Sequence, residues 1–141
     1  MRSSGSLLIA MLLAAATAIT MVGGCAGGAD SGPPRARVSG KITLDGLPVT
    51  GGEIRFRPAK GAETSTLISA DGTYRIDFLN DSPVVGPNKV FIEWYLPTGK
   101  KDEDGNPFVA PAIPEKYNTA STLTVEIAAG QNEHNFVLQS K

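Results

Sequence analysis

The feature that most limits the fold of this chain is a series of short segments in which apolar and polar residues alternate. In the first segment, residues 37–44, Val38, Ile42 and Leu44 fall on one face and Lys41 falls on the other. Alternation with a period of two is typical of a strand that buries one side. Six further segments show related patterns between turn residues: 53–58, 64–69, 73–78, 89–95, 122–128 and 134–139. Together they predict an all-β domain, an antiparallel sandwich of about seven strands.

The alternation also predicts which side chains form the core. The second segment turns Ile54 and Phe56 inward, and the fourth turns Tyr74, Ile76 and Phe78 inward. Residues 89–95 carry apolar side chains on both faces, so we expect a central strand there.

Turn residues and prolines divide the remaining chain into connections. Asp45-Gly46 and Asp71-Gly72 are dipeptides that favour tight hairpin turns. Residues 47–49 and 80–88 are expected to be irregular because they contain proline. Residues 96–118 contain four prolines, and we expect a long irregular loop, which in a compact domain tends to be functional or mobile.

The run Val22-Gly23-Gly24-Cys25 fits the recognition site of a lipoprotein signal peptidase. Arg2 precedes an apolar stretch, residues 7–22, that is shorter than the roughly 20 residues needed to span a bilayer. We therefore expect residues 1–24 to be a signal peptide with a signal helix. Val22, Gly23 and Gly24 would be read by the peptidase, and Cys25 would be lipidated, with palmitate among its acyl chains. An uncleaved membrane anchor, or a plain signal peptide with a chance cysteine, stays open as an alternative.

The remaining chain divides into a linker and one domain. Residues 25–36 hold the acylated Cys25 and a stretch rich in Gly, Ala and Pro, which predicts a flexible tether. Residues 37–139 hold all the aromatic side chains and form the expected domain. The sequence has one cysteine, so no internal disulfide supports this domain.

Charge and residue inventory restrict the functions that we consider. The formal net charge of the full sequence is −1, which predicts no nucleic-acid partner. The one histidine, His134, leaves Ser-His-Asp and zinc sites with too few residues. We therefore expect no enzymatic activity, no catalytic residue and no cofactor, with a hydrolase as the least favoured alternative.

Several motifs, in order along the chain, resemble carboxypeptidase regulatory-like domains of the transthyretin-like (prealbumin-like) group. They are Val38-Ser39-Gly40-Lys41-Ile42-Thr43-Leu44-Asp45-Gly46, Asp71-Gly72-Thr73-Tyr74 and Ile113-Pro114-Glu115-Lys116-Tyr117-Asn118. Asn88-Lys89 departs from the family pattern, which has an aromatic residue there. The resemblance implies a Greek-key sandwich and a small bacterial lipoprotein of the cell envelope. Related adhesin repeats join a lysine to an asparagine through an isopeptide bond, for which Lys41, Asn135 and Glu93 would be the candidates.

Two further groups of residues are candidate ligand sites. Asp102, Asp104 and Asn106 offer the oxygen atoms that calcium prefers, but their spacing does not match a known calcium loop, and a solvated acidic turn is the favoured interpretation. Tyr95 and Phe108 are candidate contacts for a sugar or peptide. If they are exposed, a binding role is favoured; if they are buried, a structural role is favoured.

The function that we expect is a non-enzymatic structural or binding role in a lipid-anchored protein of the cell envelope. The alternative is a carbohydrate- or peptide-binding accessory module for a partner enzyme. The lipid on Cys25 would connect the chain to a membrane, facing the periplasm or the cell surface. Since Ala26 rather than an aspartate follows Cys25, we expect the outer membrane. The protein or glycan partner stays unknown at this point.

Overall fold

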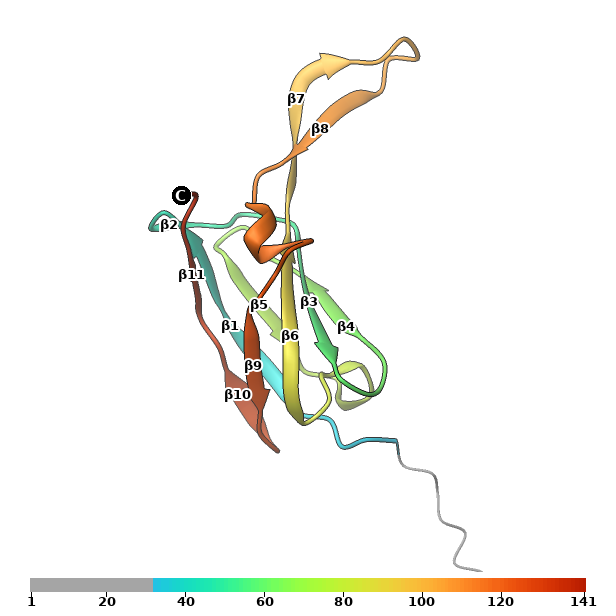
Figure 1. Ribbon diagram of the computed structural model, residues 1–141, viewed down its shortest axis with the longest axis vertical. Helices are drawn as coiled ribbons and strands as arrows, with labels where there is room; N and C mark the ends of the chain where they lie inside the picture. The colour runs from blue at the N-terminus through green and yellow to red at the C-terminus, as the bar shows by residue number, and fades with distance from the viewer. Residues whose placement is uncertain (1–31) are drawn as a thin grey trace, which may run out of the picture.

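The alternating segments are strands in the computed structural model, which describes residues 32–141 (Figure 1). The described part contains eleven strands and two short 3₁₀ helices: β1 (Arg37–Leu44), β2 (Leu47–Pro48), β3 (Glu53–Pro58), β4 (Thr64–Leu67), β5 (Thr73–Ile76), η1 (Leu79–Asp81), β6 (Gly86–Glu93), β7 (Tyr95–Lys101), β8 (Pro107–Pro111), η2 (Glu115–Tyr117), β9 (Thr124–Ile127), β10 (Gln131–Glu133) and β11 (Phe136–Leu138). The signal peptide, Cys25 and the linker up to residue 31 lie outside the described residues. The expected all-β class is confirmed, and the seven expected strands correspond to β1, β3, β4, β5, β6, β9 and β11.

Two sheets face one another. One has the order β4-β3-β6-β9 and is antiparallel throughout, so β6 is an internal strand as expected. In the other sheet, β1 pairs with β5 and β2 on one side and with β10 and β11 on the other. The pairings of β1 with β10 and β11 are parallel, which the antiparallel prediction does not include. The last strand is thus divided into two parts by His134 and Asn135, and both parts run beside the first strand.

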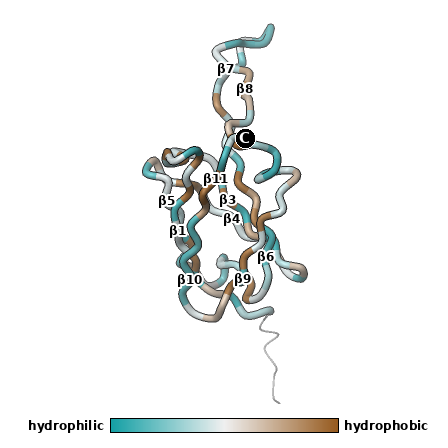
Figure 2. The backbone as a smooth tube through the Cα atoms, turned by 60° about the vertical axis from the view of Figure 1, so that its left-hand side comes forward, coloured by the Kyte–Doolittle hydropathy of each residue, from teal (hydrophilic) through white to brown (hydrophobic). Residues whose placement is uncertain are grey.

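Side chains from both sheets fill the space between them. Tyr74 lies at the centre, with ring centroids 6.0 Å from Phe56 and 6.3 Å from Phe136. The other buried apolar residues of this cluster are Ala36, Val38, Ile42, Val49, Ile54, Ile68, Ile76, Val90, Ile92, Ile113, Ile127 and Leu138. Such burial of alternate residues from several strands is the main stabilising contribution in a domain of this size. Figure 2 shows the hydrophobic segments of the tube within the sandwich.

The two halves of the last strand meet β1 at an unusually close approach. A Cβ atom placed on Gly40 would lie 1.8 Å from the carbonyl oxygen of His134, so a larger residue does not fit without movement. At the same point the His134 N–H donates to Ser39 O at 2.9 Å, and the Tyr74 hydroxyl donates to His134 O at 2.7 Å. Burial raises the pKa of the Tyr74 hydroxyl well above its usual value.

Three sequence predictions are wrong in detail. Phe78, expected inside, has 78% of its surface exposed because β5 ends at Ile76. Residues 47–49 are not wholly irregular, since Leu47 and Pro48 pair with the end of β1. β6 begins at Gly86, inside the expected connection, and the buried Asn88 side chain donates to the carbonyls of Val84 and Gly86.

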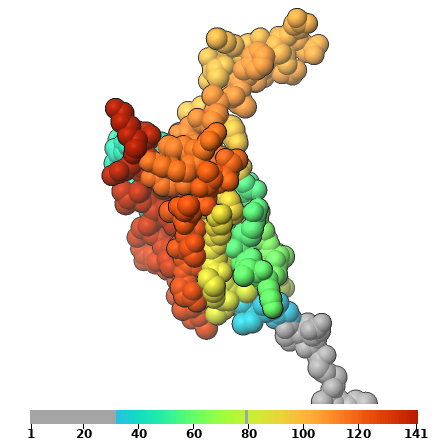
Figure 3. Space-filling model, in the orientation of Figure 1, coloured from blue at the N-terminus to red at the C-terminus, as the bar shows by residue number. Residues whose placement is uncertain are grey.

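The largest difference concerns residues 96–118, for which an irregular loop was expected. This stretch contains most of β7, all of β8 and the 3₁₀ helix η2. β7 and β8 form a separate two-stranded sheet that stands out from the sandwich (Figures 1 and 3). We call residues 95–111 the arm.

The described residues include no helix that is both long enough and apolar enough to cross a membrane.

Candidate functional site

The arm is rooted in the core at both of its ends. β7 follows directly on β6 through Trp94, which is partly buried against the core. The Ala112 N–H donates to Trp94 O at 2.7 Å, and the next residue, Ile113, has only 1% of its surface exposed. The partly buried Trp94 and the buried Ile113 therefore hold the base of the arm while its strands leave the sandwich.

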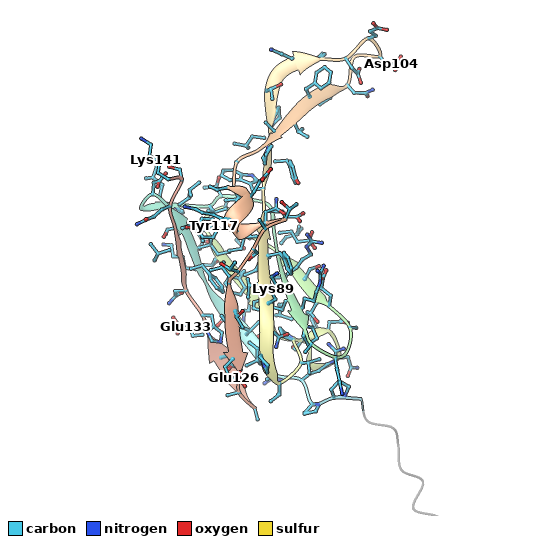
Figure 4. The ribbon with its side chains drawn as sticks, in the orientation of Figure 1. Lys89, Asp104, Tyr117, Glu126, Glu133 and Lys141 are labelled. Atoms are coloured by element: carbon cyan, nitrogen blue, oxygen red, sulfur yellow. The ribbon has the colours of Figure 1, made fainter. Side chains whose placement is uncertain are left out.

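The segment after the arm docks on the sandwich through Ile113 and Tyr117. The Tyr117 ring packs against the core, and its hydroxyl oxygen accepts the N–H of Gln139 at 3.0 Å. Ser121 is buried and donates its hydroxyl to Val90 O. Figure 4 places Tyr117 beneath the arm, at the arm's end of the sandwich.

Every residue of β7 and of β8 is exposed. The largest apolar side chains among them are those of Tyr95, Leu96, Phe108 and Val109, whose exposed fractions are 48%, 42%, 53% and 55%. An isolated two-stranded sheet is marginally stable in water, and grouped exposed apolar residues mark interaction surfaces. The exposure of Tyr95 and Phe108 therefore favours a binding role for the arm.

The two aromatic candidates do not lie on the same face of the arm. Tyr95 pairs with Pro111 and Pro97 pairs with Val109, so these four share one face. Leu96 pairs with Ala110, which places Phe108, two residues from Ala110, on the opposite face. The arm is consequently apolar on both faces and offers no flat platform made of two aromatic rings.

Prolines close the outer edges of the arm. Two backbone bonds show which residues are hydrogen-bonded across the hairpin: Ala112 N–H donates to Trp94 O, and Asp102 N–H donates to Asn106 O. In an antiparallel pair the N–H and C=O groups of every second residue point away from the partner strand, so the residues between the bonded ones direct these groups outward. By this alternation Pro97, Pro107 and Pro111 occupy outward positions, where an N–H is missing. Proline at such positions blocks the addition of another strand. The outward position also explains why the two strands tolerate these three prolines, which in the sequence predict a loop. The hydrogen bonds across the hairpin do not use the proline nitrogens.

The tip of the arm is a charged turn organised by Asp102. One carboxylate oxygen of Asp102 accepts the N–H groups of Asp104, at 3.0 Å, and Asn106, at 2.8 Å. The other oxygen accepts the side-chain amide of Asn106 at 3.1 Å. These bonds, led by those from Asn106, lower the pKa of Asp102. Figures 2 and 4 show the hydrophilic tip and Asp104 at the far end of the arm.

The calcium candidates thus have a structural role in the turn. Both oxygens of Asp102 are engaged by the turn itself. Within residues 32–141, no three His, Cys, Asp or Glu side chains gather in an arrangement that could hold a metal ion.

Other candidates lie in the sandwich, and the structure does not gather them into a site. His134 is half-buried between β10 and β11, where its backbone groups hold β1 and Tyr74. The Lys41 backbone N–H donates to the side-chain oxygen of Asn135, while Glu93 forms an ion pair with Arg55 in the opposite sheet. The three residues suggested for an isopeptide bond are therefore not assembled.

Leu96 and Val109 are surface residues of the arm that the sequence interpretation did not single out. The signal that could have located them is Asp104-Gly105, a hairpin dipeptide between two short apolar segments. Gly105 has a φ of 84°, a conformation that glycine adopts without strain.

Comparison with known proteins assigns no family to the chain. No family model matches it, and no curated protein matches it. One similar solved structure is a DUF3823 family protein from Parabacteroides merdae, with a TM-score of 0.41 and 15% identity, covering 75% of this chain and 46% of that one. Another is a 9R-lipoxygenase from Cyanothece, with a TM-score of 0.40 and 12% identity, covering 77% of this chain and 17% of that one. The chain thus spans less than half the length of either protein.

Proposed function

We propose that this chain is a non-enzymatic binding module of the cell envelope, held at a membrane by a lipid on Cys25, that contacts a protein partner through the arm. The observation that carries this proposal is the exposure of both strands of the arm, with large apolar side chains on both faces. A structural role alone gives no reason to hold these side chains in water, away from the core.

The geometry of the arm favours a protein over a glycan as the partner. Sugar rings stack on a flat aromatic surface, but Tyr95 and Phe108 lie on opposite faces of the ribbon. Strand addition is disfavoured by the prolines along both outer edges. The occupant that fits is a protein with an apolar cleft that takes up the arm from both sides and leaves the charged tip in water.

The anchor is supported by the sequence Val22-Gly23-Gly24-Cys25. The start of the described chain, from residue 32 to β1, lies at the end of the sandwich opposite the arm (Figure 1). A tether at that end directs the arm away from the membrane, towards a partner. Membership of the carboxypeptidase regulatory-like group and a location at the outer membrane belong to the same proposal.

Photo-crosslinking in the native host tests the binding role. A photoreactive residue is placed at Tyr95, at Phe108 or, as a control, at Val137, which is apolar and 75% exposed on β11. We expect both arm positions, but not position 137, to crosslink to the same protein. Crosslinking to glycan alone, or equally from position 137, would contradict the proposed role of the arm.

The anchor is tested separately by measuring the intact mass of the protein purified from its native membrane. We expect cleavage before Cys25 and a mass increase equal to a diacylglyceryl group with its acyl chains. An unlipidated Cys25 would refute the anchor and leave the result for the arm intact.

A further inference from the structure

A cluster of cations lies on the outer face of the four-stranded sheet, away from the arm. Arg55 and Arg57 on β3 and Lys89 on β6 surround the ring of Phe91, with their charged groups 5.8, 4.5 and 5.4 Å from the ring centroid. Phe91 has only 6% of its surface exposed, because it lies among these side chains. Figure 4 shows Lys89 on the central part of β6.

The charges in this cluster are unevenly balanced. Glu63 pairs with both arginines, at 3.6 Å from Arg55 and 2.6 Å from Arg57, and Glu93 pairs with Arg55. Among the described residues, no acidic side chain forms an ion pair with Lys89. Positive charge therefore remains on the side of the cluster formed by Lys89.

Arg57 and Lys89 are direct cross-strand partners. Like charges at directly opposite positions destabilise a sheet. Here Glu63 neutralises part of the charge on Arg57 and the Phe91 ring attracts both cations, so Lys89 is the cation of the pair whose charge has no acidic partner among the described residues. An anion placed between the two cations removes the repulsion. The pair is thus suited to bind an anion at the expense of stability in the free protein.

A cleft of about 280 Å³ lies at this pair. Its lining consists of the two cations, the Thr124 side chain of β9 and an apolar surface formed by Pro58, Ala59 and Pro87. The volume is just below the usual range of about 300 to 1,000 Å³ for ligand sites, which limits the ligand to a group of about the size of one sugar ring. The Nε of Arg57 is bonded to Glu63 at 2.6 Å, so its two Nη groups remain for a ligand.

We propose that this cleft binds a carboxylated or sulfated sugar. The Nη groups of Arg57 donate to the anionic group as a fork, Lys89 adds a second positive charge, and the Thr124 hydroxyl bonds a ring hydroxyl. The C–H face of the sugar packs on the two prolines and Ala59. The site does not depend on the arm or on its partner.

A sugar is favoured over a lipid phosphate by the apolar lining of the cleft, Pro58, Ala59 and Pro87, against which the C–H face of a ring packs. The cleft lies in the half of the sheet nearer the end where the chain enters: Pro58 is the last residue of β3, and both Pro58 and Pro33 lie within 4 Å of a Cβ placed on Gly61. Its position is therefore also accessible to a lipid headgroup. Anionic vesicles provide the test of the lipid alternative.

The first experiment is a calorimetric titration of the full-length protein with four probes: a galacturonic acid trimer, glucose 6-sulfate, glucose and inorganic sulfate. We expect the two acidic sugars to bind and to weaken between about 20 and 200 mM salt, with glucose and inorganic sulfate binding at least about tenfold more weakly. Equal binding of glucose would refute the role of the cations. Equal binding of inorganic sulfate would refute the role of the apolar surface, and selective binding to vesicles of anionic lipid would assign the site to a membrane.

Variants identify the residues involved. Arg57→Gln or Lys89→Gln is expected to reduce affinity for the acidic sugars about tenfold, since each removes one charge-assisted contact. Lys100→Gln and Lys101→Gln on the arm are the matched controls and are expected to bind as the unmodified protein does. An equal loss in the controls would show that the effect is only one of net charge.

The free protein supplies an independent measurement. If Arg57 and Lys89 repel one another, Lys89→Gln has a higher Tm than the unmodified protein at low salt and without ligand. The difference narrows as salt increases, because salt screens the repulsion. A lower Tm for Lys89→Gln at low salt would refute the argument from the like-charge pair.

Discussion

Gly40 occupies the point where β1 meets the interrupted last strand, and replacing it with alanine tests the account of that junction. The new Cβ would lie 1.8 Å from the His134 carbonyl oxygen and 2.9 Å from a ring carbon of Tyr74. Because the first contact is with backbone, no change of side-chain rotamer relieves it. The strand containing His134 must move away from β1.

The expected cost of Gly40→Ala follows from the bonds at the junction. Movement of His134 breaks its N–H bond to Ser39 and the bond that its carbonyl accepts from Tyr74, each with a net value of about 1 kcal/mol. Crowding in a packed interior adds about 1 to 3 kcal/mol. We therefore expect a loss of about 3 to 5 kcal/mol in the free energy of unfolding, a large part of the roughly 5 to 15 kcal/mol typical of a domain.

Urea denaturation of residues 32–141, followed by tryptophan fluorescence, measures this loss. The midpoint is expected to fall by about 2 M, given the usual dependence of stability on urea. Gly32→Ala is the control, since nothing lies within 4 Å of its added Cβ. A shift below about 0.5 M for Gly40→Ala would refute the close approach of β1 and His134.

Three further predictions concern single polar groups. Tyr74→Phe should lower the free energy of unfolding by about 1 to 3 kcal/mol in urea denaturation, because the partly buried His134 carbonyl loses its donor. Since the folded-state pKa of Tyr74 is raised, the stability that its protonated form contributes is complete below the ordinary tyrosine pKa of 10.0 and is lost as the pH rises through the folded-state pKa. Ultraviolet titration of Tyr74→Phe should lack the most alkaline tyrosine transition. Asp102→Ala should speed amide hydrogen exchange at the tip of the arm and leave exchange in the sandwich unchanged. In the unmodified protein the same loss of protection, measured against the intrinsic exchange rate at each pH, should appear as the pH falls through the lowered pKa of Asp102, and unchanged protection would refute its role in the turn. Ser121→Ala should cost about 1 to 3 kcal/mol by chemical denaturation, since its buried hydroxyl bonds Val90 O, and a change near zero would count against that bond.

Period-two alternation predicted most strands of the sandwich, because most of them have one side in the core and one in water; the short strands β2 and β10 were not predicted. Ile54 and Phe56 on β3, and Phe136 and Leu138 on β11, are buried as their alternation predicts. Phe78 shows the limit of the rule. Alternation continues past Ile76 in the sequence, but no partner strand continues beside it, and pairing is not visible in the pattern of one segment.

The sequence did not predict the strands of the arm because the effect of a proline depends on whether its backbone nitrogen faces the partner strand or faces outward. A proline that must bond across a ladder breaks it, whereas Pro97, Pro107 and Pro111 face outward and remove no bond. Which positions face outward depends on the register, which the sequence does not state. The same limit hid the cluster around Phe91, since the pairing of Arg57 with Lys89 requires the register of β3 and β6.

The pairing of the first strand with the last determines when the sandwich can be completed. Lys41 on β1 is bonded to Asn135, 94 residues further along the chain. A chain that emerges N-terminus first, at about 5 to 20 residues per second, therefore waits about 5 to 20 seconds between the release of β1 and the arrival of its neighbour. During this interval one edge of β1 is open to pairing with other chains. Protection of that edge by a chaperone or a translocation channel would then govern the yield of folded protein more than its final stability does.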